Sequence, residues 1–296
     1  MLNKRCLNLL FLLILPMSIN CFATEVVNKY AREGYSFFGA GYDFLDYEEN
    51  TALKIGLDTI DIETNSALNF TQQSGAYVAV NNDWGFYLVT ASTLGDSSSD
   101  ETWDIGAITV RANKVSFDRQ RLGFLASRRF SRIGYFLFGA QYGSTEFNRF
   151  AAKLTPQAAD FGIDENTFSA GTVSEKVWDL SLAGGYEWNT IFTQKEPGWR
   201  YQLQLIAGVT VISHITNTDV NEGSSFSESF NGFQVRLNWA YGYQFNDNMM
   251  IAFSLEAGFS RRNAINRDFS DASGIVEFPE SNLFYFYPSL VALWSF

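Results

Sequence analysis

Apolar and polar residues alternate along several long stretches of this chain. One face of residues 249–259 carries Met249, Ile251, Phe253, Leu255, Ala257 and Phe259, and the other carries Met250, Ala252, Ser254, Glu256 and Gly258. The same period of two runs through 201–211, 232–245 and 284–296. Successive side chains of a β-strand point to opposite faces, whereas a helix repeats every 3.6 residues. The pattern therefore predicts an all-β protein built from long strands.

Aromatic residues gather near the ends of these alternating stretches. The pairs are Tyr42 and Phe44, Tyr186 and Trp188, Tyr243 and Phe245, and Trp294 and Phe296. A soluble β-sandwich also alternates, but it has no reason to place aromatic rings at strand ends. Rings with an apolar body and a polar edge favour the headgroup level of a bilayer. The combination favours a transmembrane antiparallel β-barrel.

The number of strands follows from their lengths and from the turns between them. A barrel strand needs roughly 9 to 11 residues to cross, and bacterial barrels close with an even number of strands. The pattern favours twelve strands with both chain ends in the periplasm. They are 34–45, 52–62, 67–80, 84–93, 103–111, 115–130, 133–144, 174–189, 199–214, 230–245, 249–261 and 283–296.

Short periplasmic turns and long extracellular loops are expected between these strands. Residues 131–132 and 246–248 are predicted tight turns, and the long polar connections are 145–173, 215–229 and 262–282. Ten strands are the alternative, with 46–66 and 94–114 assigned to extracellular loops. Twelve is preferred because 53–57 and 103–107 alternate as strands do, although it places the tight turn at 81–83 outside.

The N-terminus has the three-part layout of a secretory signal peptide. Lys4 and Arg5 precede an apolar stretch at 7–19, and Cys21 and Ala23 supply small residues before a predicted cut after Ala23. The apolar stretch is too short for a membrane-spanning helix. We therefore expect 24–296 to form a single barrel domain without cysteine, which excludes disulfides, thiol catalysis and cysteine-ligated metals.

Composition and charge narrow the class further. Aromatic residues make up 17% of the chain and hydrophobic residues 46%, yet no segment after residue 23 approaches the roughly 18 to 20 apolar residues of a membrane helix. Removal of Lys4 and Arg5 from the 21 basic residues leaves 19 against 32 acidic ones, a net charge of −13. Such a surface repels phosphate backbones, so no nucleic acid partner is expected.

The last residues, Ser289 to Phe296, carry aromatics at the final and third-last positions, Phe296 and Trp294. This ending resembles the C-terminal signal of Gram-negative outer-membrane β-barrel proteins, although Val291 stands where that signal usually has glycine. The resemblance implies a location in the cell outer membrane and contact with the barrel insertion machinery, membrane lipid and lipopolysaccharide. The oligomeric state stays open.

Polar residues on the faces opposite the lipid are the candidates for lining the lumen. They are Asp43, Arg119, Arg121, Asp179, Glu187, Gln202, Gln204, Arg236, Asn238 and Glu256. Charges of both signs allow a passive, porin-like channel for small solutes. They also allow a closed interior filled by ion pairs. The channel is the leading interpretation, and the alternative is a closed structural or surface-interaction barrel.

An outer-membrane hydrolase is a third and more remote interpretation, because it would depend on His214, the single histidine. Some outer-membrane phospholipases and lipid A deacylases place a serine nucleophile two residues from the histidine base on one strand. Here Thr216 holds that position, and Ser213 points to the opposite face. Omptin proteases pair acidic residues with a histidine, but the next carboxylate is Asp219. We therefore expect no enzyme and no catalytic residue.

The predicted outer loops are acidic. Their carboxylates are Asp46, Glu48, Glu49, Asp96, Asp100, Glu101, Asp160, Asp164, Glu165, Asp219, Glu222 and Glu228. No EF-hand spacing occurs among them, so no metal and no cofactor is expected. Arg261, Arg262 and Arg267, at the start of one outer loop, are candidate contacts for lipopolysaccharide phosphates, which guanidinium groups match in geometry.

Overall fold

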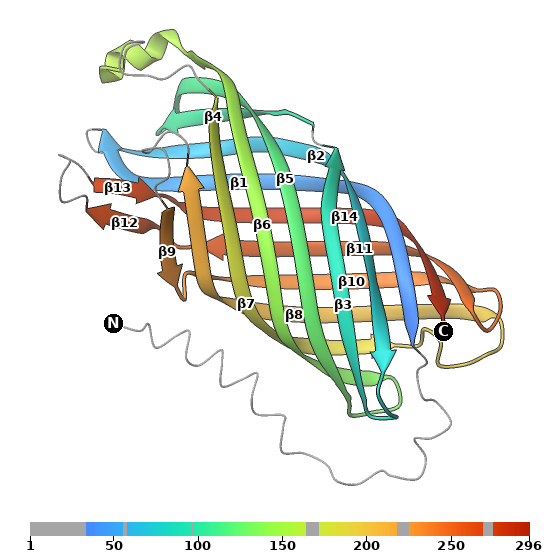
Figure 1. Ribbon diagram of the computed structural model, residues 1–296. Helices are drawn as coiled ribbons and strands as arrows, with labels where there is room; N and C mark the ends of the chain where they lie inside the picture. Colours follow the sequence, from blue (N-terminus) through green and yellow to red (C-terminus); the bar gives the residue numbers. More distant parts are fainter. Residues whose placement is uncertain (1–33, 56–57, 96, 164–171, 218–224, 269–274) are drawn as a thin grey trace.

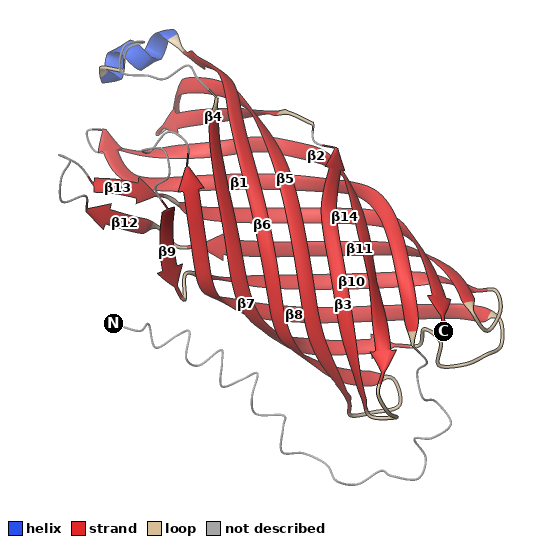
Figure 2. Ribbon diagram, viewed as in Figure 1, coloured by secondary structure: helices blue, strands red, loops and turns tan. Residues whose placement is uncertain are grey.

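A computed structural model of the chain describes residues 34–55, 58–95, 97–163, 172–217, 225–268 and 275–296. The expected signal peptide, residues 1–23, lies outside the described residues. Almost all of the described chain is strand (Figure 2). No helix in these ranges is long and apolar enough to cross a membrane.

The long strands match the stretches that alternate in sequence. They are β1 (Tyr35–Ile55), β2 (Asp58–Ala79), β3 (Trp84–Gly95), β5 (Ile108–Arg129), β6 (Gly134–Leu154), β7 (Val173–Asn189), β8 (Gly198–Asn217), β10 (Gly232–Gln244), β11 (Met249–Arg262) and β14 (Glu280–Ser295). The shorter elements are β4 (Ser99–Ile105), the 3-10 helix η3 (Pro156–Phe161), β9 (Ser225–Ser229), β12 (Ile265–Asp268) and β13 (Ile275–Phe278).

Antiparallel pairing closes the sheet on itself, because β14 pairs with β1 (Figure 1). Strand β4 continues the place of β3 between β2 and β5, and β9 continues the place of β10 beside β8. Within the described residues, the twelve strand segments of the sheet therefore occupy ten positions around a ring. The predicted transmembrane antiparallel barrel is confirmed, and its closure is that of the ten-strand alternative.

Two of the predicted strands do not cross as separate spans. Range 52–62 covers the passage from β1 to β2, and 103–111 covers the hairpin between β4 and β5, where Gly106 has a positive φ of 61°. The predicted extracellular position of the turn at 81–83 is also corrected, because this turn lies at the end that holds the turn at 246–248 (Figure 1). Alternation continues wherever a strand continues, so it cannot distinguish a crossing strand from a protruding one.

The stagger of the ring fixes its width. A path through directly paired residues leaves β1 at Tyr35, passes each position once and returns to β1 at Tyr47, twelve residues further along. With a rise of about 3.3 Å per residue and a strand spacing of about 4.8 Å, this stagger gives a tilt of about 40° and a backbone radius of about 10 Å. Long side chains from opposite walls therefore meet near the axis.

An apolar belt surrounds the outside of the ring. Leu182 and Leu290 are 61% and 67% exposed, although both lie mid-strand. Each of the ten positions contributes to the belt, through Phe38, Val78, Leu88, Phe124, Phe138, Leu182, Leu205, Leu237, Phe253 and Leu290. A continuous apolar surface of this kind suits the hydrocarbon of a bilayer. The predicted terminal signal residues, Trp294 and Phe296, face outward at the end with the short turns.

The interior contains two large apolar clusters. At the end with the short turns, Tyr35, Tyr87 and Leu293 pack around Ile191 and Phe192, which the β7–β8 connection inserts into the mouth of the barrel. We call these residues the periplasmic plug. Nearer the other end, a second cluster is built on Leu45, Tyr47, Phe117, Phe147 and Leu283, with Phe226, Ile265 and Phe278 from β9, β12 and β13. We call this second set the outer apolar layer.

Candidate functional site

All ten residues predicted to line the lumen lie on the inner face of the barrel. Six of them are buried: Asp43, Glu187, Gln202, Gln204, Arg236 and Glu256. The other four line two internal cavities: Arg119, Arg121 and Asp179 a cavity of about 140 Å³, and Asn238 a smaller one of about 40 Å³. Alternation was therefore sufficient to assign their face.

Ion pairs cross the middle of the lumen. Arg119 Nη1 lies 2.7 Å from Asp43 Oδ2. Arg121 binds Glu256 in a bidentate manner, with Nη2 to Oε2 at 3.0 Å, and the Tyr285 hydroxyl donates to the same carboxylate at 2.9 Å. Strands β5 and β11 are five positions apart in the ring of ten, so the pair between Arg121 and Glu256 joins opposite walls.

A second polar group supports the periplasmic plug. The Glu187 carboxylate accepts hydrogen bonds from the Tyr87 hydroxyl at 2.5 Å, Asn189 Nδ2 at 2.6 Å and Gln202 Nε2 at 2.7 Å. Asn189 Oδ1 in turn accepts from the backbone N–H of Ile191 at 2.6 Å. These buried bonds hold the connection that carries Ile191 and Phe192 inside the mouth.

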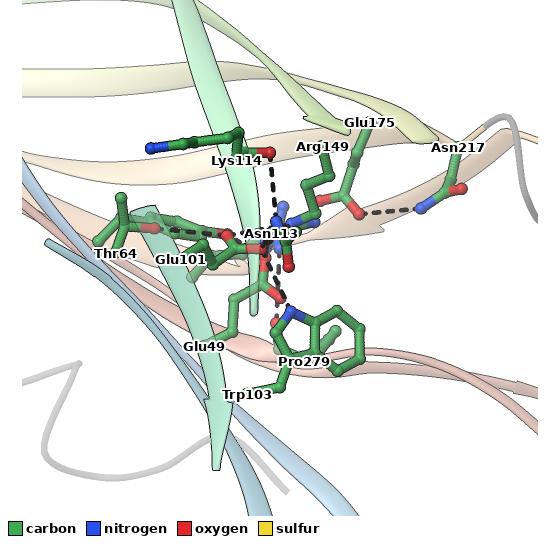
Figure 3. A network of polar contacts seen from close by, with 12 residues as sticks. Glu49, Thr64, Glu101, Trp103, Asn113, Lys114, Arg149, Glu175, Asn217 and Pro279 are labelled. Atoms are coloured by element: carbon green, nitrogen blue, oxygen red, sulfur yellow. Dashed lines mark hydrogen bonds and ion pairs between the residues drawn. The ribbon is translucent and has the colours of Figure 1, made fainter. Parts of the chain in front are cut away.

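A third polar group, centred on Arg149, was not predicted from the sequence (Figure 3). It adjoins the outer apolar layer, because the Tyr47 hydroxyl donates to Glu49, and it lies beyond the exposed belt. Arg149 Nη2 lies 2.9 Å from Glu49 Oε1, and its Nε lies 2.9 Å from Glu101 Oε1. The amide of Asn113 donates to Glu101 Oε1 at 2.9 Å. Burial alone raises the pKa of Glu49, but the Arg149 charge and the hydrogen bond from Tyr47 outweigh it, so this pKa lies below its ordinary value.

The sequence contained a signal for this group. Glu49 was assigned to an acidic loop and Arg149 to the connection 145–173, because predicted strands ended after about 12 residues. In the structure β1 continues to Ile55 and β6 to Leu154. Glu49 keeps the inward parity of Leu45 and Tyr47, and extending the period of two by four residues would have turned it inward.

The three arginines proposed to contact lipopolysaccharide have different surroundings. Arg261 is exposed and pairs with Glu280 at 2.7 Å. Arg262 points inward, is 7% exposed and lies 3.7 Å from Glu175, so its assignment as a lipid contact is wrong. Neighbouring residues of a strand face opposite sides, which separates the two. Arg267 lies in β12, and its side chain is outside the described residues.

The histidine that a hydrolase would use lies on the outer face. His214 alternates with Ser213 and Ile215, which are fully buried inside, and its ring stacks on Trp178 with the centroids 5.2 Å apart. Its Nδ1 is 2.8 Å from the Ser227 hydroxyl on the paired strand β9. A hydroxyl and an imidazole are therefore in hydrogen-bond contact, but away from the lumen.

The strands that protrude beyond the belt carry carboxylates on their outward face. Glu48 of β1 stands directly opposite Glu63 of β2, and Asp61 of β2 stands opposite Asp104 of β4. Like charges in these positions repel each other. Among the described residues, no group of three or more histidine, cysteine or acidic side chains is arranged to hold a metal ion.

Comparison with known proteins identifies the fold but no family. No protein-family model matches the chain, and no curated protein matches it in sequence. The outer membrane protease OmpT from Escherichia coli is similar in structure, with a TM-score of 0.62 at 9% identity over 90% of this chain and 97% of that one. OprG from Pseudomonas aeruginosa gives 0.37 at 8% identity, covering 90% and 99%. The translocator domain of NalP from Neisseria meningitidis gives 0.35 at 10%, covering 99% and 95%. The chain thus has the fold of Gram-negative outer-membrane β-barrels.

Proposed function

We propose that this protein is a closed barrel of the outer membrane that acts as a surface-interaction protein, through the parts of its strands that protrude above the outer leaflet. We call the protruding parts of β1, β2, β4, β5 and β6 the outer wall. The observation that carries the proposal is strand length. Strands β1, β2, β5 and β6 have 21 or 22 residues, about twice the roughly 9 to 11 that crossing requires. On the other side of the ring, β10 and β11 have 13 and 14. Building so much ordered sheet outside the bilayer favours a function there.

The filling of the lumen supports the closed barrel over the passive channel. A water path along the axis would have to cross the outer apolar layer and the periplasmic plug, where Ile191 and Phe192 are 0% and 3% exposed. Between them, the pair formed by Arg121 and Glu256 reaches from wall to wall. A ring about 10 Å in backbone radius leaves little space once such side chains are in place.

The negative charge of the outer wall indicates the kind of partner that it would bind. Strands β1, β2 and β4 together form a sheet that stands beyond the belt at the end opposite the short turns (Figure 1). The outward residues Glu48 and Glu63 face each other across β1 and β2, at a cost of roughly 0.2–1 kcal/mol for each such pair. A partner with basic groups would neutralise this repulsion, so we expect a cationic partner molecule.

Closure is tested by conductance. Purified, folded protein is inserted into planar bilayers and compared with an open porin under the same conditions. A closed barrel gives no single-channel steps, whereas a passive channel gives steps in the native protein. Regular steps would therefore overturn the closed barrel and restore the channel interpretation.

Partner binding is tested separately, with the protein in nanodiscs of zwitterionic lipid and a fluorescent lysine-rich peptide as the probe. The variant Glu48→Gln/Glu63→Gln/Asp61→Asn/Asp104→Asn is expected to bind the peptide several-fold more weakly. The matched control Asp83→Asn/Asp247→Asn removes carboxylates from the turns at the opposite end and should leave binding unchanged. Binding should also fall at high salt, because exposed charges are screened. Equal binding by the three proteins would refute a role for the outer wall.

A hydrolase is a second candidate, supported by the contact of 2.8 Å between His214 Nδ1 and the Ser227 hydroxyl. In such a pair the imidazole accepts the hydroxyl proton while the oxygen attacks an acyl carbonyl. Labelling with a fluorophosphonate probe tests it. Labelling of the native protein that disappears in both Ser227→Ala and His214→Ala would support the enzyme, and an unlabelled native protein would contradict it.

A further inference from the structure

The larger of the two internal cavities lies between the apolar clusters. Tyr47, Phe147 and Leu283 of the outer apolar layer line one side of this cavity of about 140 Å³, which we call the chamber. Tyr35 and Leu293 of the periplasmic plug line the smaller cavity of about 40 Å³. Glu256 lines both cavities, so it stands between them. The chamber is thus a polar space inside the barrel with an apolar layer toward each mouth.

Several polar atoms of side chains on the chamber wall are buried without a hydrogen-bond partner, although other atoms of Arg121 and Asp43 are paired. They include the donors Gln141 Nε2, Asn231 Nδ2 and Arg121 Nε, and the acceptors Asp43 Oδ1 and Asp179 Oδ1. Gln141 and Asn231 are each 3% exposed. A buried donor or acceptor left unpaired costs about 1–3 kcal/mol. Several in one cavity therefore indicate that something polar occupies it in the folded protein.

The chemistry of these groups defines what fits. Amide and guanidinium donors match a carboxylate, and the two aspartate oxygens match an ammonium group. An ion of one sign would satisfy either the donors or the acceptors of the chamber, but not both. It would also place a net charge in a buried space, which is costly. A water molecule needs roughly 10–15 Å³ of such volume, so 140 Å³ also accommodates a molecule of several heavy atoms.

We propose that the chamber binds one small zwitterion of the size of an α-amino acid, with its carboxylate toward Gln141, Asn231 and Arg121 and its ammonium group toward Asp43 and Asp179. A ligand exchanging with the outside through the outer mouth would pass the outer apolar layer. Phe226 of β9 and Phe278 of β13 pack there with ring centroids 4.8 Å apart, and β12 and β13 pair only with each other rather than with the ring.

Equilibrium dialysis tests the proposal directly. The folded protein in a non-ionic detergent is dialysed to equilibrium against radiolabelled glycine, L-alanine and L-serine, and separately against acetate and methylammonium. At least one of the amino acids should bind with about one molecule per barrel. Neither singly charged probe should bind, because acetate satisfies only the donors of the chamber and methylammonium only its acceptors.

Variants on two different strands locate the binding. Gln141→Leu on β6 and Asp179→Asn on β7 should each weaken amino-acid binding at least tenfold. The matched control is Ser127→Ala, a buried lumen residue that does not line the chamber and should bind as the native protein does. Folding of each variant is checked by the shift of its electrophoretic mobility on unheated gels. If only one of the two variants folds, that variant is sufficient to test the proposal. Absence of amino-acid binding by the native protein, leaving a chamber filled with water only, would overturn the proposal, as would undiminished binding by the folded variants.

Discussion

Arg149 holds together the polar group above the outer apolar layer. Replacing Arg149 by methionine should therefore destabilise the part of the outer wall that this group joins. The side chains of Arg149, Glu49 and Glu101 are 6%, 3% and 0% exposed, so the ion pairs are buried. Arg149→Met keeps an unbranched apolar side chain but removes the guanidinium group, which leaves two carboxylates facing each other inside the protein. Removing one partner of a buried ion pair costs about 3–5 kcal/mol, because the remaining charge has lost its compensation.

The expected effect is local, since Arg149 joins the protruding parts of β1, β4 and β6. Amide hydrogen exchange of these segments, measured in nanodiscs by mass spectrometry, should accelerate by about 10²- to 10⁴-fold if opening costs about 3–5 kcal/mol less. Segments within the belt, such as the middle of β10, should exchange as before. The triple variant Arg149→Met/Glu49→Gln/Glu101→Gln has no unpaired charge and should regain most of the lost protection.

The dependence on pH provides a second check. In the native protein the pKa of Glu49 lies below its ordinary value, so its ion pair stabilises the fold at neutral pH and is lost as pH falls through that lowered pKa. In Arg149→Met a proton on Glu49 removes an unpaired charge, and acidification should then stabilise the segment. Less than a tenfold acceleration in the single variant, or faster exchange in the triple than in the single, would refute the reasoning.

Three further predictions concern the plug, the outer carboxylates and the belt. Phe192 has a positive φ of 50°, so Phe192→Gly should be about 1 kcal/mol more stable than Phe192→Ala in urea unfolding, the reverse of the usual order in a strand or helix. Burial, and secondly the charge of Glu49, raise the pKa of Glu175 by more than the charge of Arg262 lowers it, so the negative charge of Glu175 destabilises the fold as pH rises through that pKa. Arg262 still has the charges of Glu49 and Asp179 nearby when Glu175 is replaced. Glu175→Gln should therefore increase the free energy of unfolding at neutral pH and leave it unchanged below about pH 4, near the ordinary value for Glu; a decrease at neutral pH would contradict this sign. Leu290→Arg, in the middle of the belt, should cost about 2–4 kcal/mol in lipid vesicles, whereas Ile108→Arg at the tip of the β4–β5 hairpin should cost almost nothing. Similar costs at both sites would place the belt elsewhere.

The sequence predicted which side of the barrel a residue faces far better than where each strand leaves the bilayer. Strand β11 was assigned as 249–261 and is Met249–Arg262, and all ten lumen residues point inward. The same period of two does not tell where a strand leaves the bilayer, so 52–62 became a separate span. The assignment of Arg262 failed for a related reason. It was grouped with Arg261 by proximity in sequence, although adjacent residues of one strand lie on opposite sides of the wall.

The state of the lumen could not be predicted from lining residues alone. Whether Arg121 reaches Glu256 depends on the radius of the ring, which depends on strand number and stagger together. Both quantities come from long-range pairing, such as that of Leu283 with Tyr47. The plug was equally hidden, because Ile191 and Phe192 belong to a connection, and connections are normally expected on the surface.

The polar side chains in the middle of the lumen are better explained by the requirements of export, before the chain folds, than by a contribution to the stability of the folded barrel. Buried ion pairs such as that of Arg121 with Glu256 are often no more stabilising than well-packed apolar side chains. An apolar lumen, however, would turn each strand into a continuous hydrophobic segment, because the outward face is already apolar. Strand β14 comes close to this limit: Phe284, Phe286 and Leu290 face outward, and the inward Tyr285 and Ser289 interrupt the run. Segments of about 20 apolar residues insert into membranes as helices, so inward polar residues keep an exported chain from stopping there. Once the strands close, those polar groups are confined within about 10 Å of the axis, and they satisfy one another across the lumen or through a polar molecule held between them.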